Sequence, residues 1–289
     1  MGNLDGKVAI ITGAGNGIGK SHALYFAEQG AKVVVNDLGG ARDGEGSDGA
    51  VASQVVEEIR GAGGEAVPSF DSVATGEGAD AMIRTALDAF GRLDILVNNA
   101  GILRDKTLVK MEDSMWDAVM AVHLRGTFLC TRAAVRQMRL QNEAGDAEGG
   151  RIINTTSISG LLGNFGQGNY GAAKAGVYGF TRCVSQETKK HRITVNCVAP
   201  VAHTRLTADI PMFMMPGMGE AKMGPQYIAP VVAFLASDLA ADITGEVIGV
   251  AGARVYRFKM VEGAGVVHPE GQPWTPEELR ERWAEISRI

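Results

Sequence analysis

Short β-branched runs alternate with helix-length amphipathic segments through the first half of the chain. The runs at 8–12 and 32–36 are rich in valine and isoleucine, and an amphipathic segment that ends at Gly30 separates them. Apolar strands joined by crossover helices are typical of a parallel sheet that is covered on both faces. We therefore predict the α/β class, with a single doubly wound, parallel, seven-stranded, Rossmann-like sheet. The remaining strands are expected at 66–70, 94–98, 151–154, 193–196 and 245–250.

The pattern changes in two places. Residues 38–49 are rich in glycine, and we interpret them as a mobile surface excursion. Beyond residue 252 the chain carries several prolines and then a short helix, for which Thr275 and Glu278 predict a capping box. We therefore predict a main domain at 1–252 and a C-terminal extension at 253–289, packed on the same domain or on a partner subunit.

Composition excludes several classes of function. The 289 residues carry a net charge of -5, which argues against a nucleic-acid-binding surface. No run is long and apolar enough for a membrane helix, and no signal peptide is recognisable. The three cysteines lack metal-ligand spacing and are expected to be buried reduced thiols. We predict a cytoplasmic protein without a metal, and we treat the final Ser-Arg-Ile as a random tail rather than a peroxisomal signal.

A glycine-rich turn follows the first predicted strand. Gly13, Gly17 and Gly19 lie where that strand passes into a helix, and glycines there allow a pyrophosphate to approach the helix N-terminus. Asp37 ends the second predicted strand, where a carboxylate can bind the ribose hydroxyls of an adenosine and would repel a 2′-phosphate. These residues predict a dinucleotide site that favours NAD over NADP.

Tyr170 and Lys174 are four residues apart and would share one face of a helix. An ammonium beside a phenol favours the phenolate, so we expect Lys174 to lower the pKa of Tyr170. Such a tyrosine can exchange a proton with an alcohol or a carbonyl group. Ser157, thirteen residues earlier, could polarise the same oxygen.

Four separated motifs carry a family resemblance. Thr12-x3-Gly-x-Gly, Asn98-Asn-Ala-Gly101, Ser157 and Tyr170-x3-Lys174 have the order and spacing of the short-chain dehydrogenase/reductase family over about residues 6–252. Several further segments, including Val122-His-Leu-Arg-Gly126, resemble the (3R)-hydroxyacyl-CoA dehydrogenase unit of multifunctional enzyme type 2 and its bacterial relatives.

The resemblance implies a role for each matching residue. Tyr170 would be the general acid/base, Lys174 would bind the nicotinamide ribose, and Ser157 would hold the substrate oxygen. Other residues would contact NAD; they are Gly13, Gly17, Ile18, Gly19, Asp37, Ser72, Val73, Asn99 and Thr204. Such domains usually form homodimers or homotetramers through two long helices, expected here at 113–140 and 169–190.

Four features modify that expectation. His123 replaces the asparagine that the family usually has, and we interpret it as structural rather than catalytic. Pro200 is followed by Val201 where the family has glycine, so the loop that reaches Thr204 can differ in shape. A methionine-rich stretch at 211–218 is either a substrate lid or a packed helix. Arg104, Lys106 or Arg205 could meet a CoA phosphate, although a solvated side chain is the simpler interpretation of each.

Together these features predict an NAD-dependent oxidoreductase of lipid metabolism that interconverts a secondary alcohol and a ketone. The substrate expected from the resemblance is a (3R)-3-hydroxyacyl-CoA. A hydroxysteroid dehydrogenase and a 3-oxoacyl-carrier-protein reductase are the alternatives within the family. A catalytically silent NAD-binding sensor is the alternative from another class of function.

Overall fold

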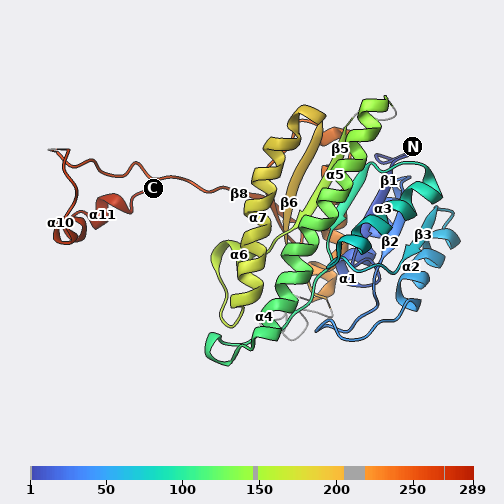
Figure 1. The fold of residues 1–289 in the computed structure, drawn as a ribbon, viewed down its shortest axis with the longest axis horizontal. Helices are drawn as coiled ribbons and strands as arrows, with labels where there is room; N and C mark the ends of the chain where they lie inside the picture. The colour runs from blue at the N-terminus through green and yellow to red at the C-terminus, as the bar shows by residue number, and fades with distance from the viewer. Residues whose placement is uncertain (1, 146–148, 205–218, 270) are drawn as a thin grey trace. The chain divides into compact units, whose positions relative to one another are not determined.

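One eight-stranded sheet organises the chain. The computed structural model describes residues 2–145, 149–204, 219–269 and 271–289. The strand order is β3-β2-β1-β4-β5-β6-β7-β8, and every pairing from β3 to β7 is parallel (Figure 1). The strands are β1 (Val8–Thr12), β2 (Lys32–Asn36), β3 (Ala66–Ser69), β4 (Ile95–Asn98), β5 (Gly150–Thr155), β6 (Ile193–Val201), β7 (Val247–Ala251) and β8 (Arg254–Phe258).

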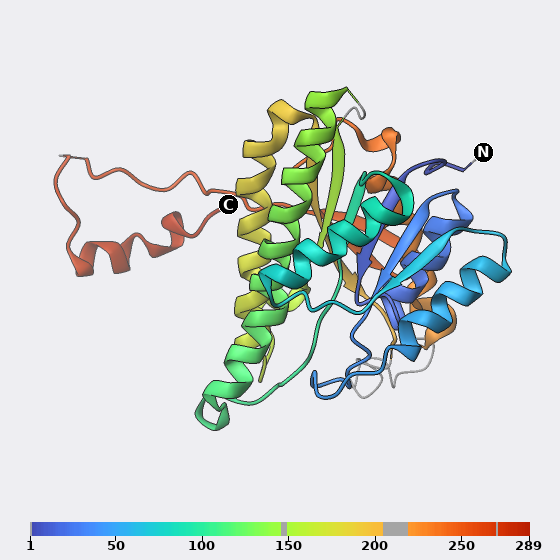
Figure 2. The ribbon, with the colours of Figure 1, turned by 45° about the vertical axis from the view of Figure 1, so that its right-hand side comes forward.

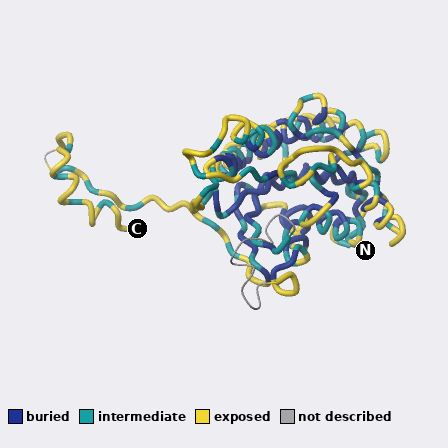
Figure 3. The backbone as a smooth tube through the Cα atoms, turned by 90° about the horizontal axis from the view of Figure 1, so that it is seen from below, coloured by how far each residue is buried: buried dark blue, intermediate teal, exposed yellow. Residues whose placement is uncertain are grey.

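Helices cover both faces of the sheet, as predicted (Figure 2). One face packs against α1 (Gly17–Glu28), α2 (Ala50–Gly61) and α9 (Ala229–Ala236). The other face packs against α3 (Gly76–Phe90), α5 (Gly126–Ala144) and α7 (Gly168–Thr188). Successive side chains of a strand point to opposite faces, and because helices cover both faces, the central strands β1, β4 and β5 are buried at every residue, inside the main unit (Figure 3).

The other α-helices among the described residues are short. They are α4 (Asp113–Met120), α6 (Ile158–Leu162), α8 (Glu220–Met223), α10 (Pro276–Glu281) and α11 (Trp283–Ile286), and a π-helical turn, Ala121–Arg125, joins α4 to α5. The predicted capping box at Thr275 and Glu278 is confirmed at the start of α10.

The predicted strand number was wrong by one. All seven predicted strands are present, with ends shifted by a few residues, and β8 lies beyond them. Only two residues separate β7 from β8, and a connection that short joins antiparallel neighbours. The alternation in β8 is weak, because two arginines lie among its five residues. The unit Met1–Arg257 contains nearly all of β8, and Phe258–Ile289 forms a second unit.

Two expectations from composition can be compared with the structure. No helix among the described residues is both long and apolar enough to span a bilayer. Cys130 and Cys197 are buried, but Cys183 is exposed, so the expectation that all three thiols are buried was wrong.

The strand order reverses between β1 and β4. The chain runs outward from β1 through β2 to β3, and then returns to place β4 on the other side of β1. Such a reversal opens a crevice at the carboxyl ends of the two central strands, and ligands of this fold class bind there. The glycine-rich turn follows β1 and the Asn98-Asn-Ala-Gly101 segment follows β4, so both motifs lie at this crevice.

Candidate active site

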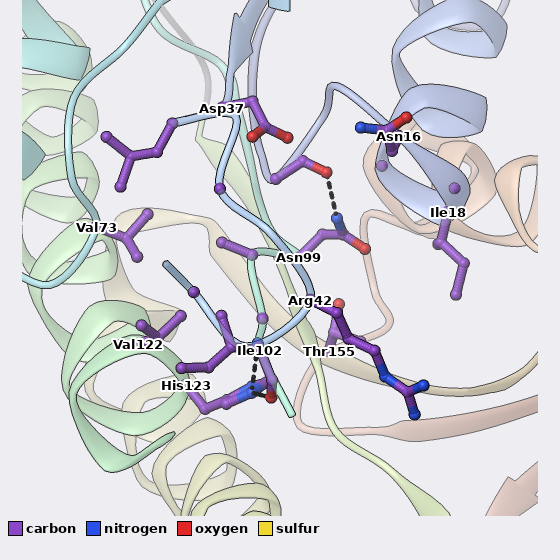
Figure 4. Close-up of a pocket in the computed structure, with 18 of the residues that line it drawn as sticks. Asn16, Ile18, Asp37, Arg42, Val73, Asn99, Ile102, Val122, His123 and Thr155 are labelled. Atoms are coloured by element: carbon purple, nitrogen blue, oxygen red, sulfur yellow. Dashed lines mark hydrogen bonds between the residues drawn. The ribbon is translucent and has the colours of Figure 1, made fainter. Parts of the chain in front are cut away.

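A cavity of about 290 Å³ occupies this crevice (Figure 4). Its wall contains every residue that the sequence assigned to the cofactor, namely Gly13, Gly17, Ile18, Gly19, Asp37, Ser72, Val73, Asn99, Tyr170, Lys174 and Thr204. The wall also contains residues that sequence reasoning missed, namely Asn16, Arg42, Gly44, Gly46, Ile102, Leu103, Val122 and Thr155.

The glycine turn requires glycine for two separate reasons. Gly13 and Gly17 have φ of 63° and 54°, a left-handed conformation that other residues rarely adopt. A Cβ on Gly19 would overlap the carbonyl oxygen of Gly13. A Cβ on Gly17 would meet only Thr204, 3.7 Å away across the cavity. The turn therefore brings bare backbone to the cavity wall.

The N-terminus of α1 is well suited to a phosphate group. Asn16 is its N-cap residue, but the Asn16 side chain makes no capping hydrogen bond and the first turn holds no acidic residue. The first N–H groups of a helix have no partner within the helix and carry partial positive charge. The residues here consequently fit the pyrophosphate of a dinucleotide.

Asn99 holds the glycine turn in place. Its side-chain amide donates to the carbonyl oxygens of Thr12 and Gly13, both at 3.0 Å. The Thr12 hydroxyl in turn accepts from the backbone N–H groups of Asn99 and Ala100. Asn99 lines the cavity as expected, and its two amide hydrogens fasten the end of β4 to the end of β1.

Asp37 presents a carboxylate that is fixed on both oxygens. Oδ2 accepts from the backbone N–H of Gly15 at 2.8 Å, and Oδ1 accepts from that of Gly39 at 2.7 Å. Next to it, the buried Asn36 donates to the carbonyl oxygen of Asp71 at 2.9 Å. That bond fixes the segment after β3 and thereby places Ser72 and Val73 at the cavity.

The glycine-rich segment after β2 lies on the surface, as expected, and it is hydrogen-bonded to the segment that follows β4 at the end of the crevice. The backbone N–H of Leu103 donates to the carbonyl oxygen of Arg42 at 3.0 Å. Arg104 donates to the carbonyl oxygen of Asp43 at 2.8 Å and forms an ion pair with Glu45. These contacts bring Arg42 into the cavity wall. They also pair Arg104, which the sequence suggested as a solvated side chain or a CoA contact, with the glycine-rich segment.

Tyr170, Lys174 and Ser157 meet at the other end of the cavity. The Lys174 ammonium lies 5.6 Å from the centre of the Tyr170 ring and donates to the carbonyl oxygen of Thr155 at 2.6 Å. Ser157 caps α6 by accepting from the N–H of Ser159 at 3.2 Å, and its side chain is near enough to Tyr170 to affect the pKa of that phenol. Ser157 is buried beside the cavity and is not part of its wall.

The pKa of Tyr170 differs from expectation. Burial raises the pKa of Tyr170, and the hydrogen bond with Ser157 lowers it by a smaller amount. Burial also lowers the pKa of Lys174 to about 8. The predicted lowering of the Tyr170 pKa by Lys174 is therefore wrong for the polypeptide alone, since burial dominates and the ammonium is directed at the Thr155 carbonyl.

His123 is a buried neutral imidazole. Its Nε2 accepts from the backbone N–H of Ile102 at 3.0 Å (Figure 4), and its ring meets the Tyr170 ring edge-on, with the ring centres 5.2 Å apart. Burial, together with the nearby charge of Lys174, lowers the pKa of His123 to about 3. The ring lies directly over Gly101, where a Cβ would collide with it. These contacts agree with a structural histidine.

The β6 end of the cavity is regular as far as the structure describes it. Pro200 and Val201 stay in β6 and pair with Val250 and Ala251, so the missing glycine leaves the strand intact. Thr204 lies beyond them on the cavity wall. Arg205 and the expected lid at 211–218 lie outside the described residues.

The comparisons agree with this geometry. The family model for short chain dehydrogenases matches residues 7–211. The peroxisomal multifunctional enzyme type 2 of Drosophila melanogaster is 46% identical over 98% of the chain, which spans only 45% of that longer protein. A hydroxyacyl-CoA dehydrogenase of Mycobacterium tuberculosis is 40% identical over 96% of the chain and 87% of its own length. A crystal structure of a short chain dehydrogenase from Mycobacterium avium is 42% identical, with a TM-score of 0.86, and covers 99% of this chain and 95% of that one.

Proposed function

The chain belongs to the short-chain dehydrogenase/reductase family, whose members act on CH–OH groups with a nicotinamide dinucleotide, and from this premise we propose that it is an NAD-dependent (3R)-3-hydroxyacyl-CoA dehydrogenase. One observation carries the proposal: Tyr170 and Lys174 line the same cavity as the anchored Asp37, and the buried Ser157 lies beside them. Proton-transferring groups and a ribose-binding carboxylate thus belong to one site.

The polypeptide supplies proton transfer and orientation. The dinucleotide, when bound, supplies the acceptor for the hydride that leaves the carbinol carbon. Tyr170 takes the hydroxyl proton of the substrate, and Ser157 donates a hydrogen bond to the same oxygen. Lys174 lines the cavity beside Tyr170, where its bond to the Thr155 carbonyl holds it, and it would bind the nicotinamide ribose of the cofactor.

The preference for NAD follows from Asp37. Both carboxylate oxygens accept backbone N–H groups, so the side chain cannot turn away without losing two charge-assisted hydrogen bonds. A 2′-phosphate placed against it would meet a fixed negative charge. Arg42 also lines the cavity, and Figure 4 shows it directed away from Asp37, so it is a poor counter-charge for a 2′-phosphate there.

The substrate assignment is supported by relatives and by the chemistry of the cavity. The Mycobacterium tuberculosis relative is named a hydroxyacyl-CoA dehydrogenase. The apolar residues Ile102, Leu103 and Val122 line the cavity together with Tyr170 and offer a surface for an acyl chain. These side chains follow β4 or belong to the π-helical turn that joins α4 to α5.

A substrate panel tests the proposal. Purified protein is incubated with NAD or NADP and with (3R)- and (3S)-3-hydroxyacyl-CoAs of graded length, 17-hydroxysteroids and 3-hydroxyacyl carrier protein, and reduced cofactor is measured by absorbance. We expect the highest kcat/KM for a (3R)-acyl-CoA with NAD. A higher kcat/KM for a steroid or for an acyl carrier protein would contradict the proposed substrate, and equal use of NADP would contradict the proposed cofactor. Binding of NADH without turnover of any compound would indicate a sensor.

We also propose a homodimer or homotetramer that forms through α4, α5 and α7. Trp116 on α4 and Phe128 on α5 each keep 39% of their surface exposed, and Phe128 packs edge-on against Phe180 of α7. Light scattering of the wild type and of a Phe128→Glu variant tests this surface. A wild-type protein that is monomeric at micromolar concentration contradicts it.

A further inference from the structure

A second cleft lies at the opposite end of the sheet. It encloses about 740 Å³ at the amino ends of β1, β4, β5 and β6, whereas the dinucleotide cavity lies at their carboxyl ends. Arg151, the second residue of β5, lines the cleft, and Thr155, the last residue of the same strand, lines the cavity. The two sites are therefore separated by the length of the central strands.

Cationic side chains predominate in this amino-end cleft. Its wall carries five cations, Lys7, Arg92, Arg151, Lys189 and Arg192, and two carboxylates, Asp238 and Asp242. Asp94, beneath the wall, is paired with Arg92 at 2.7 Å. The described part of the cleft is thus positive in a chain whose net charge is -5. A cleft of one sign raises the local concentration of ligands of the opposite sign.

Arg151 is held in a fixed orientation. Its side chain is about nine-tenths buried, and its guanidinium donates to the carbonyl oxygen of Ser237 at 3.3 Å and to Asp238 at 3.1 Å. The Lys7 ammonium lies 3.4 Å from Oδ2 of the same Asp238, so one carboxylate is paired with two cations. The positive charge of this corner is therefore only partly balanced by the described residues.

The hydroxyl of Thr194 lacks a partner. Thr194 lines the cleft beside Arg151, its partner in the β5–β6 register, and only 5% of its surface is exposed. Its Oγ1 is buried without a hydrogen bond to any described residue. Buried hydroxyls nearly always have a partner in native proteins, and an exception often marks a site for an unseen group.

The backbone at Arg192 adds an independent observation. Among the described residues, Arg192 is the one non-glycine residue with a left-handed conformation, at φ 54°. Glycine would adopt this conformation at lower cost. Arg192 nevertheless carries a long cationic side chain at this position in the wall of the cleft.

We propose that the amino-end cleft is a binding site for a phosphate-bearing anion. Guanidinium and ammonium groups would bind the phosphate oxygens, and the Thr194 hydroxyl would donate to one of them. The site is independent of the proposed dehydrogenase activity, because it shares no residue with the cavity that holds Tyr170.

Calorimetric titration with pyrophosphate tests the site. The full-length protein is first saturated with NADH, so that the helix N-terminus at the cavity is occupied, and inorganic phosphate, sulfate and chloride are titrated at matched ionic strength. Two variants remove one exposed lysine each by the same change, Lys189→Gln inside the cleft and Lys110→Gln outside it. Arg192→Gly removes a charge at a position where glycine suits the backbone, and it therefore distinguishes loss of binding from loss of folding.

The expected result is saturable binding of pyrophosphate that Arg192→Gly and Lys189→Gln each weaken by about tenfold, as for the loss of one charge-assisted hydrogen bond. Lys110→Gln should bind like the wild type, and circular dichroism should show all variants folded. Equal binding by all variants, or an effect reproduced by chloride at the same ionic strength, overturns the proposal. Absence of saturable binding to the wild type also overturns it.

Discussion

The two ends of the sheet present different chemistry to a ligand. At the carboxyl end, the cavity wall consists largely of glycines, backbone N–H groups and apolar side chains, with Asp37 and Lys174 as fixed charges. At the amino end, the cleft wall consists largely of long cationic side chains. The carboxyl-end cavity is therefore formed mainly by the conformation of the backbone, whereas the amino-end cleft is formed mainly by the side chains of residues from separate segments.

This difference explains why only one of the two sites can be found in the sequence. A backbone site requires residues at a fixed spacing along one turn, so it leaves a motif such as Gly13-x3-Gly17-x-Gly19. A charged cleft gathers single residues from distant segments. Lys7, Arg92 and Arg151 come from three different strand starts, and no spacing links them.

The largest expected effect is confined to the carboxyl end of the sheet. Tyr170→Phe removes the hydroxyl that exchanges a proton, and we expect kcat to fall by about 10² to 10⁴. NADH affinity and pyrophosphate binding at the amino end should stay within error of the wild type. Steady-state kinetics and calorimetry on the same preparation check this. Substantial residual activity would show that another group transfers the proton.

The next effect concerns cofactor choice at the carboxyl end. Asp37→Ala removes the fixed negative charge, and we expect the preference for NAD over NADP, as a ratio of kcat/KM values, to fall by about 10- to 100-fold. Asp48→Ala, which removes an exposed carboxylate from the same segment, is the matched control and should leave the ratio unchanged. An unchanged ratio in Asp37→Ala would mean that another feature rejects NADP.

Much of the fold was predictable because strong local patterns agreed with one another. The valine-rich runs, the glycine turn and Tyr170-x3-Lys174 each specify local geometry, and together they fix a parallel sheet with its crevice. The eighth strand was missed because the arginines of β8 hide its alternation. Contacts between distant segments were also missed, such as the bond between Arg42 and Leu103 that brings a glycine-rich loop to the cavity.

The electrostatics of the site were less predictable than its geometry. The spacing of Tyr170 and Lys174 placed them correctly, but it could not show that the ammonium is bound to the Thr155 carbonyl. Nor could it show how strongly burial acts on Tyr170. Burial depends on the whole fold, so the direction of a pKa shift does not follow from two residues alone.

The third and smaller expected effect is on the pH dependence of the free energy of unfolding. Burial holds the pKa of His123 and of His22 at about 3, below the ordinary value of 6.5. Between those values the unfolded chain binds protons that the folded chain does not, so the free energy of unfolding falls as pH decreases. Each histidine contributes up to about 1.4 kcal/mol per pH unit, or about 2 kcal/mol at pH 5.

Denaturant unfolding from pH 7 to pH 4 checks this contribution. His22→Leu and His123→Asn should each have a shallower dependence on pH than the wild type. Only the change at His123, which lines the cavity, should also alter activity. Parallel pH curves for the wild type and both variants would contradict the assignment of neutral, buried imidazoles.

The smallest expected effect comes from changing one threonine to valine at each end of the sheet. Thr155 at the carboxyl end of β5 and Thr194 at the amino end of β6 each bury a hydroxyl that lacks a hydrogen-bond partner among the described residues. Valine has nearly the same shape and no hydroxyl. Removing an unsatisfied buried hydroxyl should raise the free energy of unfolding by about 1 kcal/mol in each ligand-free variant.

Each ligand should reveal the loss of one of the two hydroxyls. If each hydroxyl binds a ligand, NADH will stabilise Thr155→Val less than it stabilises the wild type, and pyrophosphate will do the same for Thr194→Val. Each variant serves as the control for the other, because only one of the two ligands should distinguish it from the wild type. Thermal unfolding with and without each ligand measures the four differences. A Thr194→Val variant that responds to pyrophosphate like the wild type would leave the hydroxyl without a role in the cleft, and the cationic side chains alone would then account for any binding there.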